Sequence, residues 1–334
     1  MRQRRRAERH RSARPALQDS VQNRANERRY QKILRGSALV VGVALLVLLV
    51  AGWYFNFAKP PNKVVANLNG QEYLLRDVAP IAKLEGFLTG QFNPNVSLNT
   101  LIKNDLLQKH ASSLGIDFQS EQVDEQLIVM FEKATEPSDR PTSLSADGQE
   151  ALEKFVGTIG ISSVVYKNWI KGQLLEDSYF DLFLSNASKT ADQVFVEWIV
   201  TSNSLNAEIA YDRISSGEDF NTVAKELNID NIFAGENGVV GWVPKGALLE
   251  MDPYFFGSNN NTKRTQGPIA TSLGSIIFRI TDSSTDSTIA EDMRSRLAQN
   301  NFQSWMDQKT KEIEFTFNNN DIKWVLREME SDYE

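Results

Sequence analysis

Five fragments between residues 194 and 280 decide the fold: VFVEWIV (194–200), ISSGEDFNTVAKELNID (214–230), GVVGWV (238–243), GPIAT (267–271) and LGSIIFRI (273–280). The first and the last are short apolar runs, which are typical of buried strands. Between them, apolar side chains recur at the spacing of one helical face: Phe220, Val223, Ala224 and Leu227. Gly217 is placed to end a preceding helix. Strands, helices and glycine-rich turns within about 90 residues predict an α+β unit.

The chain on the N-terminal side of this unit, residues 71–186, is predicted to be almost entirely helical. Apolar residues recur there every three or four positions, and Gly115 is suited to a helix C-cap. A stretch rich in Pro, Ser and Asp, residues 134–148, predicts a loop. Helices are expected over 98–114, over 121–134, from about 149 onward and over 162–184.

Short strands are predicted near both ends of the region that follows residue 58. Residues 64–69 alternate weakly and end in Asn69-Gly70, a hairpin turn signal. Residues 281–288 (TDSSTDST) are expected to be a polar linker, followed by a long helix carrying Met293, Leu297 and Phe302. The alternation of Ile313, Phe315 and Phe317 predicts a final strand.

The N-terminal region predicts a membrane anchor. Residues 1–36 carry twelve Lys or Arg against three acids, although the whole chain has a net charge of −7. Residues 37–58 carry no charge, and about 22 residues would be long enough for a transmembrane helix. The positive-inside rule then predicts a single-pass protein of the cell membrane, with a cytoplasmic N-terminus and extracytoplasmic domains. A cleaved signal peptide is the alternative, and the long charged region with no small-x-small cleavage site argues against it.

The basic arm, residues 1–36, has two interpretations. It could bind anionic lipid or nucleic acid. It could also be only a topology signal in a disordered tail. No aromatic residue interleaves with the arginines before Tyr30, so a nucleic-acid partner is not expected.

Three further fragments carry a family resemblance: VANLNGQEYLL (65–75), LIKNDLLQKHASSLGIDFQSEQVDEQL (101–127) and VVYKNWIKGQLLED (164–177). They resemble the helical chaperone domain of SurA-like and PrsA-like foldases. The fragments between 194 and 280 resemble the parvulin (PpiC-type) peptidyl-prolyl isomerase domain of the same proteins. The resemblance implies a helical chaperone-like domain over 63–190, an inserted parvulin-like domain over 191–283, and a returning helix and strand over 286–334 that pack on the first domain.

The resemblance also implies a polar cluster of two histidines, a hydroxyl group and an aspartate or cysteine beside a proline pocket. The chain has only two histidines, His10 and His110, and both lie outside the parvulin-like fragments. Trp198 and Ile276 align with the histidine positions. Thr271 matches the hydroxyl position and Asp230 the aspartate position, and a lone acid beside apolar groups is expected to turn outward to water. Asp230 and Thr271 are therefore catalytic candidates, with a turn residue and a strand-edge hydroxyl as the other interpretations.

The proline pocket of the family is matched here by apolar residues. These candidates for substrate binding, for which ordinary core packing is the alternative, are Val240, Trp242, Leu248, Met251, Phe255 and Phe256. A groove lined by Met and aromatic residues suits extended, proline-containing or unfolded chains.

Other chemistries find no support in the sequence. The absence of cysteine excludes disulfides, thiolate metal sites and a cysteine nucleophile. GENGVVG (235–241) lacks the Lys-Ser/Thr ending of a phosphate-binding loop. No metal and no cofactor are expected.

Three functions remain open. The first is a membrane-anchored foldase or chaperone that binds unfolded or exported polypeptide segments. The second is a working prolyl isomerase, expected to be weak without the histidines. The third is a structural or assembly subunit of a membrane complex, in which the parvulin-like fold serves as a binding surface.

Overall fold

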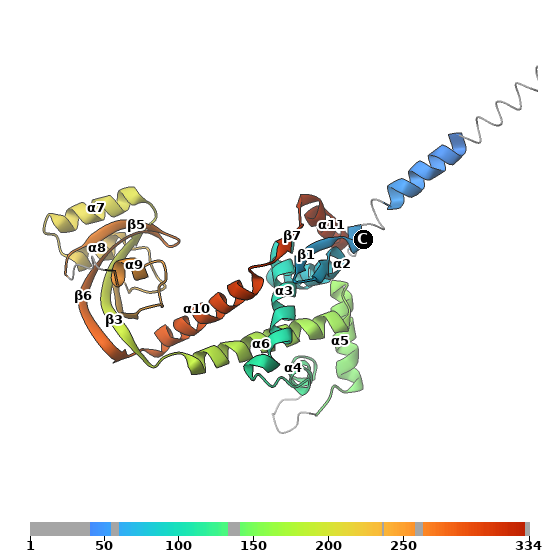
Figure 1. The fold of residues 1–334 in the computed structure, drawn as a ribbon, viewed down its shortest axis with the longest axis horizontal. Helices are drawn as coiled ribbons and strands as arrows, with labels where there is room; N and C mark the ends of the chain where they lie inside the picture. Colours follow the sequence, from blue (N-terminus) through green and yellow to red (C-terminus); the bar gives the residue numbers. More distant parts are fainter. Residues whose placement is uncertain (1–40, 55–59, 133–140, 236, 258–262, 331–334) are drawn as a thin grey trace, which may run out of the picture. The chain divides into compact units, whose positions relative to one another are not determined.

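The computed structural model describes residues 41–54, 60–132, 141–235, 237–257 and 263–330 (Figure 1). The chain divides into two compact units. The smaller comprises residues 1–66, 72–77 and 315–334, and the larger comprises residues 67–71 and 78–314. The predicted basic arm, residues 1–36, lies outside the described residues.

The predicted transmembrane span over residues 37–58 is contradicted. The described helix in this region runs over residues 41–54. Among the described residues, no helix combines the length and the apolar character that a bilayer crossing needs. The prediction of a single-pass protein of the cell membrane is therefore wrong on this finding, and the remainder of the predicted span lies outside the described residues.

The smaller unit is built around short strands and the C-terminal segment. A 3-10 turn, η2 (Pro60–Asn62), precedes β1 (Val64–Leu68) and β2 (Gln71–Leu74), and these strands form a sheet with β7 (Glu314–Phe315) in the order β2-β1-β7. The turn between β1 and β2 is the predicted one, with positive φ at Asn69 and Gly70. The last helix, α11 (Asn319–Glu330), was not predicted.

An ion pair holds α11 to the start of this unit. Lys63 Nζ lies 2.6 Å from Asp321 Oδ2 and 2.8 Å from Oδ1, and the Asp321 side chain is buried. The same carboxylate accepts the backbone N–H of Asn318, which caps the first turn of the helix. Asp321 thus joins two segments that are 258 positions apart in the sequence.

The larger unit begins with the predicted helices. They are α2 (Leu75–Thr89), whose first three residues are assigned to the smaller unit, α3 (Pro94–His110), η3 (Ser112–Leu114), α4 (Glu121–Phe131), α5 (Ala146–Ile159) and α6 (Ser163–Asn186). Ser145 and Ser162 cap α5 and α6 by accepting backbone N–H groups, and Gly115 ends η3 with a φ of 77°. Buried side chains of α2, α4, α5 and α6 form one core: Leu84, Val123, Leu127, Leu152, Val156, Ile159, Tyr166 and Ile170.

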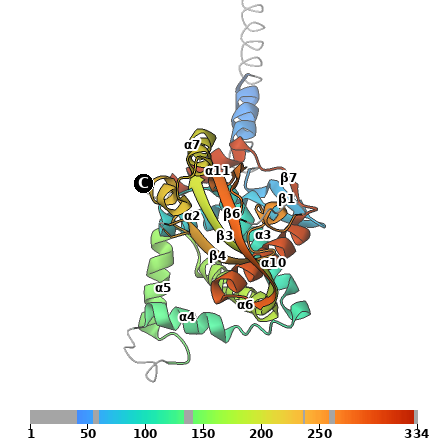
Figure 2. The ribbon, with the colours of Figure 1, turned by 90° about the vertical axis from the view of Figure 1, so that its left-hand side faces the viewer.

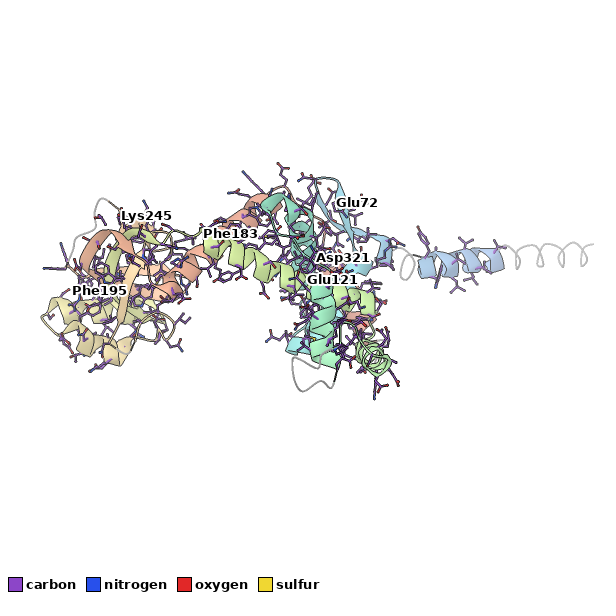
Figure 3. The ribbon with its side chains drawn as sticks, turned by 90° about the horizontal axis from the view of Figure 1, so that it is seen from below. Glu72, Glu121, Phe183, Phe195, Lys245 and Asp321 are labelled. Carbon is purple, nitrogen blue, oxygen red and sulfur yellow. The ribbon has the colours of Figure 1, made fainter. Side chains whose placement is uncertain are left out.

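A later helix, α10 (Glu291–Thr310), packs on α6 through aromatic side chains. Phe183 of α6, labelled in Figure 3, lies 5.8 Å from Phe302 of α10, measured between ring centroids. Tyr179 lies 5.1 Å from Trp305, and its hydroxyl donates to the Leu107 carbonyl. Burial raises the pKa of Tyr179 to about 12. Through this layer α10 packs on α6, a helix more than 100 positions earlier in the sequence.

The contact between α3 and α6 allows no side chain at Gly172. A Cβ added there would lie 2.3 Å from the Asn104 side chain, which is itself buried. We expect Gly172→Ala to lower the free energy of unfolding by about 2 kcal/mol through overpacking. Gly157→Ala is the matched control, because no atom lies within 4 Å of its added Cβ, and a helical alanine should stabilise by up to about 1 kcal/mol. Thermal unfolding followed by circular dichroism measures both; equal effects would contradict this packing.

The parvulin-like fragments form a four-stranded antiparallel sheet. Its strands are β3 (Thr190–Thr201), β4 (Val239–Pro244), β5 (Gln266–Thr271) and β6 (Gly274–Thr288), in the order β4-β3-β6-β5. Figure 2 shows β3 and β6 side by side as a long ribbon. The prediction of a polar linker over residues 281–288 is wrong, because these residues continue β6 and pair with β3 as far as Thr190.

The two faces of this sheet carry different helices (Figure 1). On one face, α7 (Ser204–Ser215) and α8 (Phe220–Leu227) cover Ile199 and Ile277. On the other face, α9 (Asp252–Phe255) covers the larger core, which contains Trp198, Ile276 and Phe278. Neighbouring residues of β3 therefore point to opposite faces, as alternation in a strand requires. The α+β prediction for this segment is confirmed.

Candidate functional site

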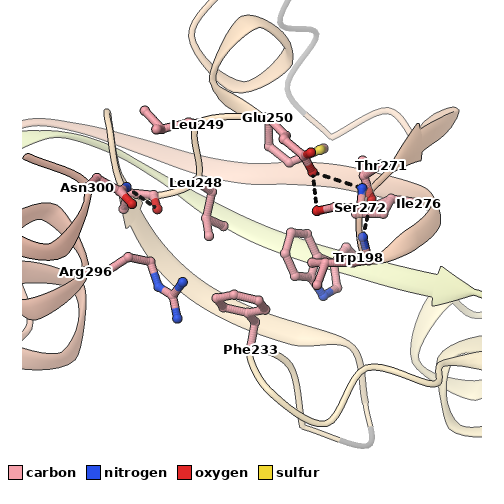
Figure 4. Close-up of a pocket in the computed structure, with 13 residues that line it drawn as sticks. Trp198, Phe233, Leu248, Leu249, Glu250, Thr271, Ser272, Ile276, Arg296 and Asn300 are labelled. Carbon is pink, nitrogen blue, oxygen red and sulfur yellow. Dashed lines mark hydrogen bonds between the residues drawn. The ribbon is translucent and has the colours of Figure 1, made fainter. Parts of the chain in front are cut away.

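A pocket of about 250 Å³ opens on the face of the sheet that carries α9 (Figure 4). The sheet, three loops and α10 all contribute to it. Its lining residues are Trp198, Phe233, Ala247, Leu248, Leu249, Glu250, Met251, Thr271, Ser272, Leu273, Ile276, Arg296 and Asn300. Trp198 and Ile276 are fully buried, whereas Leu249 and Leu273 are exposed. The pocket thus has a buried apolar floor and an apolar rim that faces solvent.

Trp198 of β3 and Asp230 form the polar contact beneath this floor. The indole Nε1 donates to Asp230 Oδ2 over 2.8 Å. The carboxylate also accepts the backbone N–H groups of Ile232, Phe233 and Ala234 at 2.9, 3.3 and 2.9 Å. The expectation that Asp230 turns outward to water is therefore wrong, because four donors satisfy its carboxylate inside the fold.

The sequence around Asn228 explains how Asp230 reaches Trp198. Asn228 Oδ1 accepts the backbone N–H of Val200 on β3, and Ile229 N donates to the Val200 carbonyl. These bonds lay the segment after α8 along β3. Asp230 then organises a turn that brings Phe233 against the indole, with ring centroids 5.5 Å apart at 85°.

The loop that follows β4 forms a second wall, and α10 holds it in place. Asn300 Nδ2 donates to the carbonyls of Gly246 and Ala247, at 2.7 and 3.1 Å. Gly246 N donates to Asp252 Oδ2 over 2.8 Å. Burial raises the pKa of Asp252, while the bond from Gly246 and the charge of Lys245 oppose that rise. Leu248 and Met251 thereby face the pocket.

The turn between β5 and β6 forms the third wall. Thr271 Oγ1 donates to the Gly274 carbonyl over 2.9 Å and accepts the Leu273 N–H. Ser272 donates through its N–H and its hydroxyl to Glu250 Oε2, at 3.1 and 2.8 Å (Figure 4). Thr271 lines the pocket, but its hydroxyl is hydrogen-bonded to backbone groups of the same turn.

The structure gathers some of the predicted groove residues and separates others. Leu248 and Met251 line the pocket. Phe255 is fully buried and packs edge-on against Phe278 at 5.3 Å. Val240 and Phe256 pack against the same core without lining the pocket. Trp242 does not line it either, since its ring packs against Phe195, 5.4 Å away.

Several lining residues were not predicted: Phe233, Ala247, Leu249, Glu250, Ser272, Leu273, Arg296 and Asn300. Two of them, Arg296 and Asn300, come from α10, well beyond the parvulin-like fragments. Arg296 lies over the Phe233 ring, 4.3 Å from its centroid. One sequence signal could have identified Leu249: it follows the predicted Leu248 in the apolar run Ala247-Leu248-Leu249.

The pocket is lined mainly by apolar side chains. Among the described residues, no cluster of His, Asp and Glu could hold a metal ion. His110 does not line the pocket and packs edge-on against Trp305 at 5.8 Å between ring centroids. Burial, with the charges of Lys309 and Lys109, lowers the pKa of His110. The pocket itself offers an apolar surface, one guanidinium and one carboxylate.

Comparisons with known proteins give remote similarities. No family model matches the chain, and no curated protein matches it. Among solved structures, the peptidylprolyl isomerase PrsA from Bacillus anthracis is 14% identical, with 71% of this chain and 96% of that chain covered and a TM-score of 0.39. A SurA-like chaperone of Campylobacter jejuni is 15% identical over 75% and 96% of the two chains, with a TM-score of 0.26.

A third solved structure is similar to a shorter part of the chain. NmPin, the parvulin of Nitrosopumilus maritimus, is 27% identical, with 27% of this chain and 96% of that chain covered and a TM-score of 0.24. At TM-scores below 0.5, none of these similarities decides the function, which has to be inferred from the site.

Proposed function

We propose that this chain is a foldase or chaperone of the parvulin peptidyl-prolyl isomerase type, which binds unfolded or proline-containing polypeptide segments and has weak or no isomerase activity. One observation carries the proposal: the pocket on the sheet has a buried apolar floor of Trp198 and Ile276 and an exposed rim of Leu249 and Leu273. Extended chains in folded proteins have their apolar groups buried, so such a pocket selects segments that are still unfolded.

The weakness of catalysis follows from the groups in the pocket. Rotation about a prolyl amide crosses a barrier of about 18–20 kcal/mol, which a site can lower by stabilising the twisted amide. Asp230 is turned to the Trp198 indole, and the Thr271 hydroxyl serves the β5–β6 turn. Positioned proton donors and acceptors typically contribute about 100-fold or more to a rate, and the two catalytic candidates Asp230 and Thr271 are both engaged in hydrogen bonds within the fold.

The helical part supplies a second apolar surface for the same clients. We place a chaperone-like domain over residues 63–190 and 286–334, with the parvulin-like domain over 191–283 inserted. Phe87, Val129 and Met130 are exposed at the edge of an aromatic cluster, in which Phe87 and Phe155 lie 5.8 Å apart. Two weak sites on one chain raise the effective concentration of a bound client.

The proposal is tested by aggregation of an unfolded client protein, followed by light scattering with the full chain present. We expect suppression at roughly equimolar ratios, and proline-limited refolding of a second client to be accelerated less than about tenfold. Serum albumin at equal mass concentration is the control. Failure to suppress any client would contradict the chaperone function.

A second function, that of a structural or assembly subunit, is favoured by the apolar pair Trp198 and Ile276 at the positions aligned with the family histidines. It predicts a stable partner of fixed stoichiometry after purification of the native protein. Transient binding of many clients and no fixed partner would contradict it.

A further inference from the structure

The two charged side chains of the pocket lie at different ends of it. In Figure 4, Arg296 and Asn300 stand on the side of α10, and Thr271 and Ser272 stand on the opposite side near Glu250. The apolar floor, Trp198 with Leu248 above it, lies between them. A ligand that crosses the floor therefore meets a cation at one end and a carboxylate at the other.

Glu250 and Arg296 differ in how many hydrogen-bond or ion-pair partners they already have. Glu250 Oε2 accepts two hydrogen bonds from Ser272, at 3.1 and 2.8 Å. Arg296 lies over Phe233, which is a cation–π contact, and among the described residues it has no carboxylate within ion-pair distance. A guanidinium keeps its five donors in a planar fork that matches a carboxylate. Stacking on Phe233 holds this fork at the pocket without consuming its donors.

We propose that Arg296 sets the ligand preference of the pocket, which takes extended peptides with an acidic residue beside the apolar anchor. This rests on the proposed function, because it names the peptide class that the same pocket binds. The apolar anchor contacts Trp198 and Leu248, and the neighbouring Asp or Glu side chain accepts the donors of Arg296.

The charge of the whole chain does not produce this preference. The chain carries a net charge of −7, so its overall field repels acidic peptides. A preference for them has to come from a local cation. The ion pair would be partly exposed, which limits it to roughly three- to tenfold in affinity, and added salt should weaken it.

The test measures binding of two fluorescent peptides to the full chain. Both carry the same apolar, proline-containing core, and they differ only by Glu against Gln next to the anchor. The wild type should bind the Glu peptide about fivefold more tightly in low salt. Arg296→Gln should remove this ratio by weakening the Glu peptide more than the Gln peptide, whereas Arg296→Glu should invert it. Lys225→Gln, an exposed lysine of α8 outside the pocket, is the charge-matched control and should keep the ratio.

The outcomes separate the two proposals. If Arg296→Gln lowers the affinity for both peptides equally, Arg296 acts only by supporting Phe233. That result would overturn the inference but not the proposal that the pocket binds peptides. Equal wild-type affinity for the two peptides would also overturn the inference and leave peptide binding in place. If the wild type binds neither peptide, the proposed function fails, and the preference fails with it.

Discussion

Replacing Leu249 by aspartate weakens binding of an apolar, proline-containing peptide by at least about tenfold. Leu249 lines the pocket and is 57% exposed, so its side chain is free for a ligand to cover. Covering a leucine contributes about 1.5–3 kcal/mol, and about 1.4 kcal/mol corresponds to a factor of ten in affinity. A charge at the same position adds a desolvation cost for any apolar ligand.

Fluorescence anisotropy with a labelled peptide measures this effect on the full chain. Leu205→Asp is the matched control, because Leu205 is 64% exposed on α7 and does not line the pocket. The control should retain wild-type affinity, and both variants should keep the wild-type melting temperature. If Leu249→Asp and Leu205→Asp bind alike, the ligand does not enter this pocket.

Replacing Asp230 by alanine lowers the free energy of unfolding of the sheet domain, the part of the chain that contains β3 to β6 and α7 to α9, by about 3 kcal/mol. The carboxylate accepts four hydrogen bonds, and its loss leaves the N–H of the fully buried Trp198 without its acceptor. An unsatisfied buried donor costs about 1–3 kcal/mol, and bonds to a charged acceptor add about 1.5–3 kcal/mol. The turn at 230–234 and the pocket floor should loosen together.

Thermal unfolding and near-ultraviolet circular dichroism of the tryptophans measure the effect of Asp230→Ala. Asp230→Asn keeps an acceptor oxygen and should lose only part of the stability. Asp212→Ala, at an exposed position on α7, is the control and should change little. A wild-type melting temperature for Asp230→Ala would show that the carboxylate does not hold the indole.

Much of the sheet domain could be predicted, because its central strands are apolar runs with turn signals between them. Trp198 and Ile276 were placed on the right strands for this reason. The extension of β6 was missed because residues 281–288 are polar, and a ribbon paired only with β3 can carry polar side chains on both faces. The helix α11 was missed although its N-terminus carries capping residues: Asp321 Oδ2 accepts the backbone N–H of Asn318, and Asn318 Oδ1 accepts the backbone N–H of Asn320.

The pocket could be predicted only in part, because its walls come from distant segments. Leu248 and Met251 were found through family position. Trp242 was misplaced because it pairs with Phe195 across β3 and β4, so that strand alternation sets its ring against Phe195. Arg296 and Asn300 could not be found from the fragments, since only the packing of α10 brings that helix to the loop after β4.

One measurement tests the central claim, that the pocket on the sheet binds polypeptide, most directly. Methionine methyl NMR of the full chain follows each of its six methionines during titration with an apolar, proline-containing peptide. Met251 lines the pocket, whereas Met329 is buried in the smaller unit and serves as the internal control. A saturable shift of the Met251 signal with an unchanged Met329 signal is the predicted result. An unchanged Met251 signal at peptide concentrations that saturate binding would contradict the account.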